Sequence, residues 1–229
     1  MNINVFSAVF LLCAANVHAA YNSTTAANYA VTNYNVSYGA TTNPFINVGG
    51  VGGNCTNFGN QSISGGLLGY TSAPSLNKAL LTASATVTAT QNASLFYKCN
   101  SVTNTCQSAP WRGAQAMFSY SSSSSQTKGA RLSLVTKTAL VNGSITVLDP
   151  KKIKVGDIVF ADFDYVIGGT SNAVDHTTVV TEVRPESFWD ITTTMKYNNI
   201  RLTYQSNNVT DKGMGDLGAK VLYVYRPYV

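Results

Sequence analysis

The chain has 229 residues, a formal net charge of +5 and only 11% charged side chains. This length fits one domain with a sizeable core, and low charge with abundant Ser, Thr, Asn, Gly and Tyr is typical of extracellular β-rich proteins. The net charge suits an anionic partner such as a cell-wall polymer or a membrane surface. A nucleic-acid partner is excluded, because Lys151, Lys152 and Lys154 form the one basic cluster and no nucleic-acid motif occurs.

The amino terminus resembles a secretory signal. Asn4 to Ala15 form a short apolar run, and Val17-His18-Ala19 reads as a small-residue cleavage site, although no basic residue precedes the run. A bilayer span needs about 20 apolar residues, so the pattern predicts a signal peptide over residues 1–19 and no integral membrane span. We therefore expect one domain over residues 20–229 in a secreted, extracellular or cell-surface protein. A periplasmic location also fits.

Cysteine usage agrees with an oxidising compartment. Cys13 leaves with the predicted signal peptide, which keeps Cys55, Cys99 and Cys106 in the mature chain. Cys99 and Cys106 bracket a short polar loop, and we expect them to form a disulfide. That pairing leaves Cys55 as an unpaired cysteine, which either forms an intermolecular link or acts as a reactive thiol.

The first half of the chain predicts helices. Residues 23–38 have apolar positions at helical spacing, with Ser23 as the predicted N-cap. The glycine-rich stretch 49–53 predicts a loop, followed by a helix that starts near Cys55 and ends at Gly65-Gly66.

The remainder predicts mostly strands. Thr82 to Lys98 should be extended, Trp111 to Tyr120 a short helix, and Ser121 to Ser125 a flexible serine run. Further strands are expected over residues 144–148, 157–163, 176–183, 191–197, 200–206 and 220–225. Helices followed by strands define an α+β fold, with N-terminal helices packed on a C-terminal antiparallel sheet.

Cys55 is the candidate nucleophile. A cysteine in the first turn of a helix faces the positive end of the helix dipole, which lowers the thiol pKa and favours the reactive thiolate. Unpaired backbone N–H groups of the same turn can stabilise an oxyanion. The structural alternative is a buried cysteine that only packs the helix on the sheet.

His176 is the candidate base. It is the one histidine of the mature chain, because His18 falls in the predicted signal peptide. It starts a predicted strand after a polar loop, where its side chain can project into a cleft. A nucleophilic cysteine needs a base that takes its proton and later protonates the leaving amine. A purely structural histidine is the alternative.

Five segments occur in an order that resembles a known family: YNSTTAANYAVTNY, GGNCTNFGNQ, PWRGAQAMFSY, VGDIVFADFD with DHTTVVTEV, and IRLTYQSNN. Together they resemble the putative amidase domain of bacterial cell-surface proteins, a relative of the papain-like CHAP-type and NlpC-type cell-wall hydrolases. The resemblance runs from about Tyr21 to Leu217, with a divergent stretch from Thr71 to Ala109. It implies a papain-like α+β fold with Cys55 on the first core helix and His176 on the sheet. It also implies an amide or peptide target, with peptidoglycan peptides as the expected substrate.

The residue expected to orient His176, as the third member of a catalytic triad, departs from the family pattern. The family's Tyr-His-Thr is replaced by Tyr204-Gln205-Ser206. We expect Gln205 to orient His176 through its side-chain oxygen, with Asn207 as the alternative on the same strand face. Asp175 would point away from the site and is interpreted as a loop or cap residue.

Two functions remain open from the sequence. The first is a secreted cysteine hydrolase of an amide or peptide bond, in which hydrolysis, transpeptidation and deamidation share one acyl-thioester step. The second is a secreted binding or adhesive module with the same fold and a weakened or inactive triad. No cofactor or metal is expected, and the sequence does not fix the oligomeric state. Trp111 and Asp157 are expected to be structural, as a core residue and a turn residue.

Overall fold

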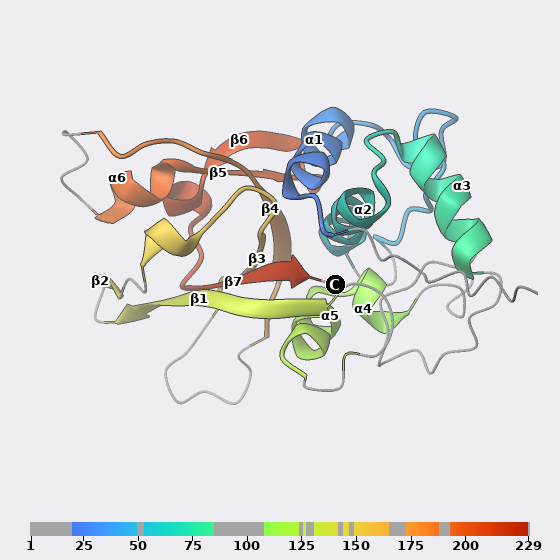
Figure 1. Ribbon diagram of the computed structural model, residues 1–229. Coiled ribbons are helices and arrows are strands. Elements are labelled where there is room, and N and C mark those ends of the chain that lie inside the picture. Colours follow the sequence, from blue (N-terminus) through green and yellow to red (C-terminus); the bar gives the residue numbers. More distant parts are fainter. Residues whose placement is uncertain are drawn as a thin grey trace, which may run out of the picture.

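The computed structural model describes residues 20–49, 53–84, 108–123, 126, 131–141, 144–146, 149–164, 173–187 and 193–228 (Figure 1). The predicted signal peptide over residues 1–19 lies outside the described residues, as does the predicted Cys99–Cys106 disulfide.

Helices fill the N-terminal half of the described chain and strands fill most of the rest. The first five helices are α1 (Ser23–Asn33), α2 (Asn54–Leu68), α3 (Ala73–Ser84), α4 (Ala109–Arg112) and α5 (Ala114–Ser121). Figure 1 shows them gathered at one side of the sheet. The fold is α+β, as predicted.

The sheet is antiparallel throughout and has the strand order β2-β1-β7-β3-β4-β5-β6 in the described part of the chain. Its strands are β1 (Arg131–Val141), β2 (Ser144–Thr146), β3 (Ile158–Asp162), β4 (His176–Val183), β5 (Ile200–Tyr204), β6 (Val209–Gly213) and β7 (Val221–Tyr228). Three short helices connect them: η1 (Pro150–Lys152), α6 (Thr193–Asn198) and η2 (Met214–Leu217). The last strand of the chain thus lies inside the sheet, between β1 and β3.

Both faces of the sheet are buried. Side chains alternate between the faces along a strand, so Ile158 and Phe160 face the N-terminal helices while Val159 faces the other side. On that other side, Tyr197 of α6 and Met214 of η2 complete a second core. The sheet is therefore held between two hydrophobic cores, one on each face.

Helix α2 is buried along residues 55–66, although many of its side chains are polar. Asn57 Oδ1 accepts hydrogen bonds from Trp111 Nε1 at 2.8 Å and from Gln61 Nε2 at 3.0 Å, and Gln61 Oε1 accepts one from Tyr29 Oη at 2.8 Å. Buried amides must be paired in this way, because an orphaned donor or acceptor costs about 1–3 kcal/mol. The network joins α1, α2 and α4, and it gives Trp111 the core role predicted for it.

The predicted ends of the first two helices were wrong. α1 ends at Asn33 rather than at residue 38. Its N-cap is Asn22 rather than Ser23, and the Asn22 side chain accepts a hydrogen bond from Thr25 N. α2 passes through Gly65 and Gly66 and ends at Leu68, followed by Gly69 with φ +79°. The glycines serve packing instead, since a Cβ on Gly66 would lie 2.8 Å from the Asn22 carbonyl oxygen.

Several other elements also differ from the predictions. Residues 82–84 belong to α3. Residues 193–197 of the strand expected over 191–197 belong to α6 instead, where Tyr197 is buried in the second core. Residues 111–120 are divided between two helices at Gly113, which has extended dihedral angles, and Ser121 still belongs to α5. Strands β1 and β6 were not predicted.

Asp157 fixes the turn before β3, as predicted. Its Oδ2 accepts from Lys154 N at 2.8 Å, and its carboxylate also pairs with Arg226 Nε at 2.8 Å.

None of the helices in the described ranges combines the length and apolar character that crossing a membrane requires.

Candidate active site

Cys55 lies in the first turn of α2, where the sequence placed it. The preceding Gly53 is the N-cap and has no side chain to cap the helix, while its N–H donates to the Arg112 carbonyl oxygen at 2.6 Å. A Cβ on Gly53 would lie 3.1 Å from Cys55 Sγ, so glycine leaves room beside the sulfur. The Cys55 residue is nevertheless only 4% exposed.

His176 begins β4, also as predicted, and the loop before it is tied down on two sides. Gln115 Oε1 of α5 accepts from Val174 N at 2.7 Å, and Asp175 N donates to the Ala161 carbonyl oxygen at 2.9 Å. The imidazole packs perpendicular to the Tyr204 ring, with the centroids 4.7 Å apart. These contacts fix both the backbone and the ring of His176.

Asp175 has the loop role expected of it. The residue is exposed, and its Oδ2 accepts from the Phe163 N–H at 2.9 Å. It therefore closes the loop between β3 and β4.

The structure brings Cys55 and His176 together. Burial has the largest single effect and raises the pKa of the Cys55 thiol, but the hydrogen bond and charge of His176 together with hydrogen bonds from the Thr177 backbone and the Thr56 hydroxyl outweigh it. The resulting pKa is about 7, below the ordinary value of 9.0. The lowered pKa favours the thiolate, the form that acts as a nucleophile, near neutral pH.

Two threonines connect the nucleophile's helix to the base's strand. Thr56 Oγ1 lies 3.2 Å from Thr177 Oγ1 and 3.8 Å from Cys55 Sγ. Sequence reasoning missed both residues, because threonine is common in helices and strands of this chain and neither position stands out. Their role depends on the packing of α2 against β4.

Gln205 follows the last residue of β5 and is buried. Its Nε2 donates to the Val36 carbonyl oxygen at 2.7 Å, which fixes the orientation of the amide. Its Oε1 is buried without a hydrogen-bond partner among the described residues, and so is His176 Nε2. An acceptor on Gln205 and a ring nitrogen of His176 thus both remain to be paired.

Asn207 does not share a strand face with Gln205. β5 ends at Tyr204, and Asn207 is exposed in the following turn with φ +66°. The interpretation of Asn207 as a strand residue was wrong, because the chain reverses direction immediately after β5.

One group of carboxylates in the described part of the chain is close enough to hold a metal ion: Asp162, Asp164 and Asp175, whose oxygens lie within 4.8 Å of one another. Burial raises the pKa of Asp162, and the adjacent Asp164 raises it further. Two of these carboxylates already accept backbone hydrogen bonds, Asp162 from Asp164 N and Asp175 from Phe163 N. Their visible role is to shape the loop beside His176.

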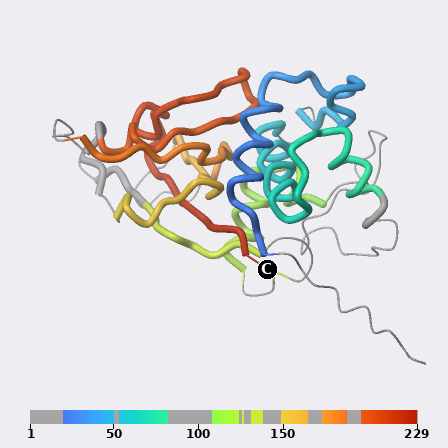
Figure 2. Tube along the Cα trace, turned by 45° about the horizontal axis from the view of Figure 1, so that its top comes forward, coloured from blue at the N-terminus to red at the C-terminus, as the bar shows by residue number. Residues whose placement is uncertain are grey.

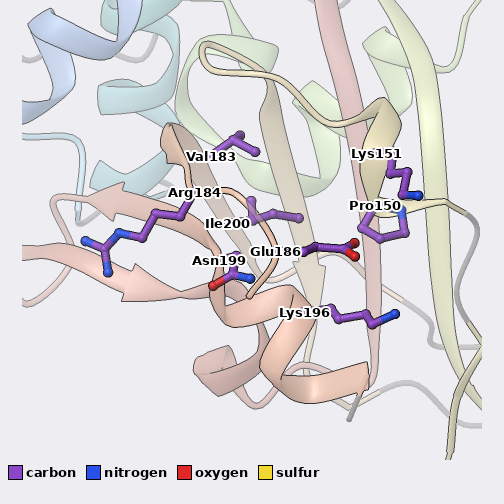
Figure 3. A pocket seen from close by; sticks show the side chains of 8 residues that line it. All are labelled: Pro150, Lys151, Val183, Arg184, Glu186, Lys196, Asn199 and Ile200. Atoms are coloured by element: carbon purple, nitrogen blue, oxygen red, sulfur yellow. The ribbon is translucent and has the colours of Figure 1, made fainter. Parts of the chain in front are cut away.

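Two pockets on the described part of the protein lie away from Cys55. A pocket of about 390 Å³ lies at the opposite end of β4, with Val183 among its lining residues, about 23 Å along the strand from His176 (Figure 3). Arg184 at its rim pairs with Glu182 and Asp211, each at 2.9 Å. A second pocket, of about 420 Å³, lies between the start of the described chain and the end of β7, which run side by side in Figure 2. Neither is lined by Cys55 or His176.

These features define an α+β domain in which a buried cysteine at a helix N-terminus contacts a histidine at a strand end. A family model described as a putative amidase domain matches residues 20–216, and the chain therefore belongs to that family. Membership confirms the resemblance noted in the sequence and makes the protein an amidase-like hydrolase that acts on C–N bonds. No curated protein and no solved structure matches the chain.

Proposed function

We propose that the protein is a secreted cysteine hydrolase that cleaves an amide or peptide bond, with peptidoglycan peptides as the first substrate class to test. The single observation that carries the proposal is the contact between Cys55 and His176, which lowers the pKa of a buried thiol to about 7. A thiol that only filled a core would have no partner that favours its charged form.

The chemistry follows in two steps. The Cys55 thiolate attacks the carbonyl carbon, and backbone N–H groups of the first turn of α2 stabilise the oxyanion. The C–N bond breaks when the His176 imidazolium gives its proton to the leaving amine, which leaves an acyl thioester. Neutral His176 then takes a proton from water, whose oxygen attacks the thioester, so that the acid departs and the thiol is restored. One amide and one water become one acid and one amine.

Gln205 is the residue that orients His176 in this proposal. Its amide nitrogen is held by the Val36 carbonyl oxygen, so its Oε1 is the atom available to accept from His176 Nε2–H. A side-chain amide can serve as the third member of a cysteine–histidine site. The two buried atoms without partners are complementary in this pairing.

Export of the chain is part of the same proposal. The family match begins at residue 20, immediately after the predicted signal peptide over residues 1–19. A Cys99–Cys106 disulfide would form in the same oxidising compartment and would keep both thiols away from Cys55.

The test is incubation of the protein with soluble peptidoglycan peptides, followed by mass spectrometry of the products. The wild-type protein should release a new acid and a new amine, and Cys55→Ala should release neither. Asp175→Asn is the matched control, since it changes the charge next to His176 without touching the reacting groups, and it should cleave like wild type. Cleavage by Cys55→Ala at the wild-type rate would refute the cysteine mechanism.

The alternative function, a binding module with an inactive triad, draws on the low exposure of Cys55 and on the unpaired His176 Nε2. It predicts that wild type and Cys55→Ala bind the same peptides with equal affinity and that neither cleaves them.

A further inference from the structure

Two buried hydroxyls lie between the nucleophile and the sheet. Thr56 and Thr177 are both fully buried, and their Oγ1 atoms are 3.2 Å apart, within hydrogen-bond distance. Thr56 Oγ1 also lies 3.8 Å from Cys55 Sγ. The three side chains thus form a continuous line from the sulfur on α2 to strand β4.

The contact between the two elements is tight around this line. A Cβ on Gly59 would lie 2.9 Å from Thr177 Cγ2, so the helix could not approach the strand so closely with any other residue at position 59. Neither hydroxyl is reached by water, and the two side chains are within hydrogen-bond distance of each other, as most buried polar groups are of a partner.

The order of donors in the line follows from the charge on sulfur. A thiolate can only accept, so the Thr56 O–H turns toward Cys55 Sγ, and the Thr56 oxygen then accepts from the Thr177 O–H. Each bond in such a chain polarises the next, and a hydrogen bond to a charged group is stronger than a neutral one.

We propose that Thr56 and Thr177 act as a two-hydroxyl relay that stabilises the Cys55 thiolate and holds the nucleophile in register with His176. Thr56 contacts the reacting sulfur directly, whereas the Thr177 hydroxyl is a positioning group that acts through Thr56. This inference rests on the proposed role of Cys55 as the nucleophile.

The chain supplies a matched control next to the relay. Thr178 is also fully buried, but its hydroxyl has no partner among the described residues. It follows Thr177 directly in β4, so its side chain points to the opposite face of the sheet. Thr178→Val therefore removes a buried hydroxyl from the same strand without touching the relay.

The experiment is the rate of Cys55 alkylation by iodoacetamide against pH, for wild type, Thr56→Val, Thr56→Ser, Thr177→Val and Thr178→Val. Thr56→Val should move the inflection upward by about one pH unit, a tenfold loss of thiolate well below the pKa. Thr56→Ser should restore the wild-type inflection, because it keeps the hydroxyl. Thr177→Val should produce a smaller upward shift, and Thr178→Val none. Thermal denaturation of each variant checks that it is folded.

The outcomes separate this inference from the proposed function. If wild type has its inflection near pH 7 and both Thr56→Val and Thr177→Val coincide with it, the relay is refuted while the nucleophile stands. Equal shifts in Thr56→Val and Thr56→Ser would also refute the relay, since packing rather than the hydroxyl would then matter. If wild type itself titrates like an ordinary thiol, the proposed function fails.

Discussion

Replacement of His176 by alanine tests the ionisation of Cys55 most directly. At pH 6, a thiol with a pKa of about 7 is about 9% thiolate, whereas one with a pKa of 9.0 is about 0.1% thiolate, a roughly 90-fold difference. A lower pKa also reduces the intrinsic nucleophilicity of the thiolate. For a Brønsted slope of 0.4–0.5, the difference between a pKa of about 7 and one of 9.0 reduces it by about eightfold. Cys55 should therefore react about tenfold faster than an ordinary thiol of equal exposure at pH 6.

The assay is iodoacetamide alkylation from pH 5 to pH 10, with the modified Cys55 peptide quantified by mass spectrometry. The inflection of the profile reports the pKa, independently of how far burial slows the absolute rate. In His176→Ala, burial of the thiol is no longer outweighed by the imidazole, so the inflection should rise by about two pH units or more. Asp175→Asn should keep the wild-type profile. The same inflection in wild type and His176→Ala would refute the reasoning.

Three further predictions concern the surroundings of this pair. Gln205→Ala should lower kcat for amide hydrolysis by about 10²- to 10⁴-fold, because it removes the acceptor that we propose for His176 Nε2–H; an unchanged kcat would exclude the role of Gln205. Gly66→Ala should lower the free energy of unfolding by about 1–3 kcal/mol in urea denaturation, despite alanine's higher helix propensity, because α1 leaves no room for a Cβ; a stabilised variant would contradict that packing. Arg226→Met should cost about 3 kcal/mol at pH 7, because it leaves the buried Asp157 carboxylate without a cationic partner. Burial already raises the pKa of Asp157 against the opposing effect of Arg226. The variant should therefore recover stability relative to wild type as the pH falls toward 4, because the Asp157 carboxyl then takes up a proton. Equal deficits in melting temperature at pH 7 and pH 4 would refute this account.

The part of the site that follows from local chemistry could be predicted from the sequence. A glycine-rich loop before Cys55 placed the thiol at a helix start, and the polar loop before His176 placed the imidazole at a strand start. Both predictions depend on residues within one turn of the functional group, where sequence pattern and structure are closely linked.

What the sequence did not reveal depends on contacts between distant segments. Gly66 reads as a helix end but faces α1. Thr193 and Thr194 are β-branched but begin a helix that buries Tyr197. Thr56 and Thr177 are 121 positions apart, and no local pattern connects them. Tertiary packing overrides local propensity in each of these cases.

The position of the last strand has a consequence for the order in which the protein can be assembled. β7 pairs with β1 on one side and β3 on the other, so the sheet stays in two separate pieces until residues 221–228 join them. During synthesis, residues 221–228 must emerge before the halves can dock, and contacts so distant in sequence form slowly. The sheet consequently forms later than one whose strands pair in sequence order, and loss of residues 221–228 would separate β1 and β2 from the strand that bears His176.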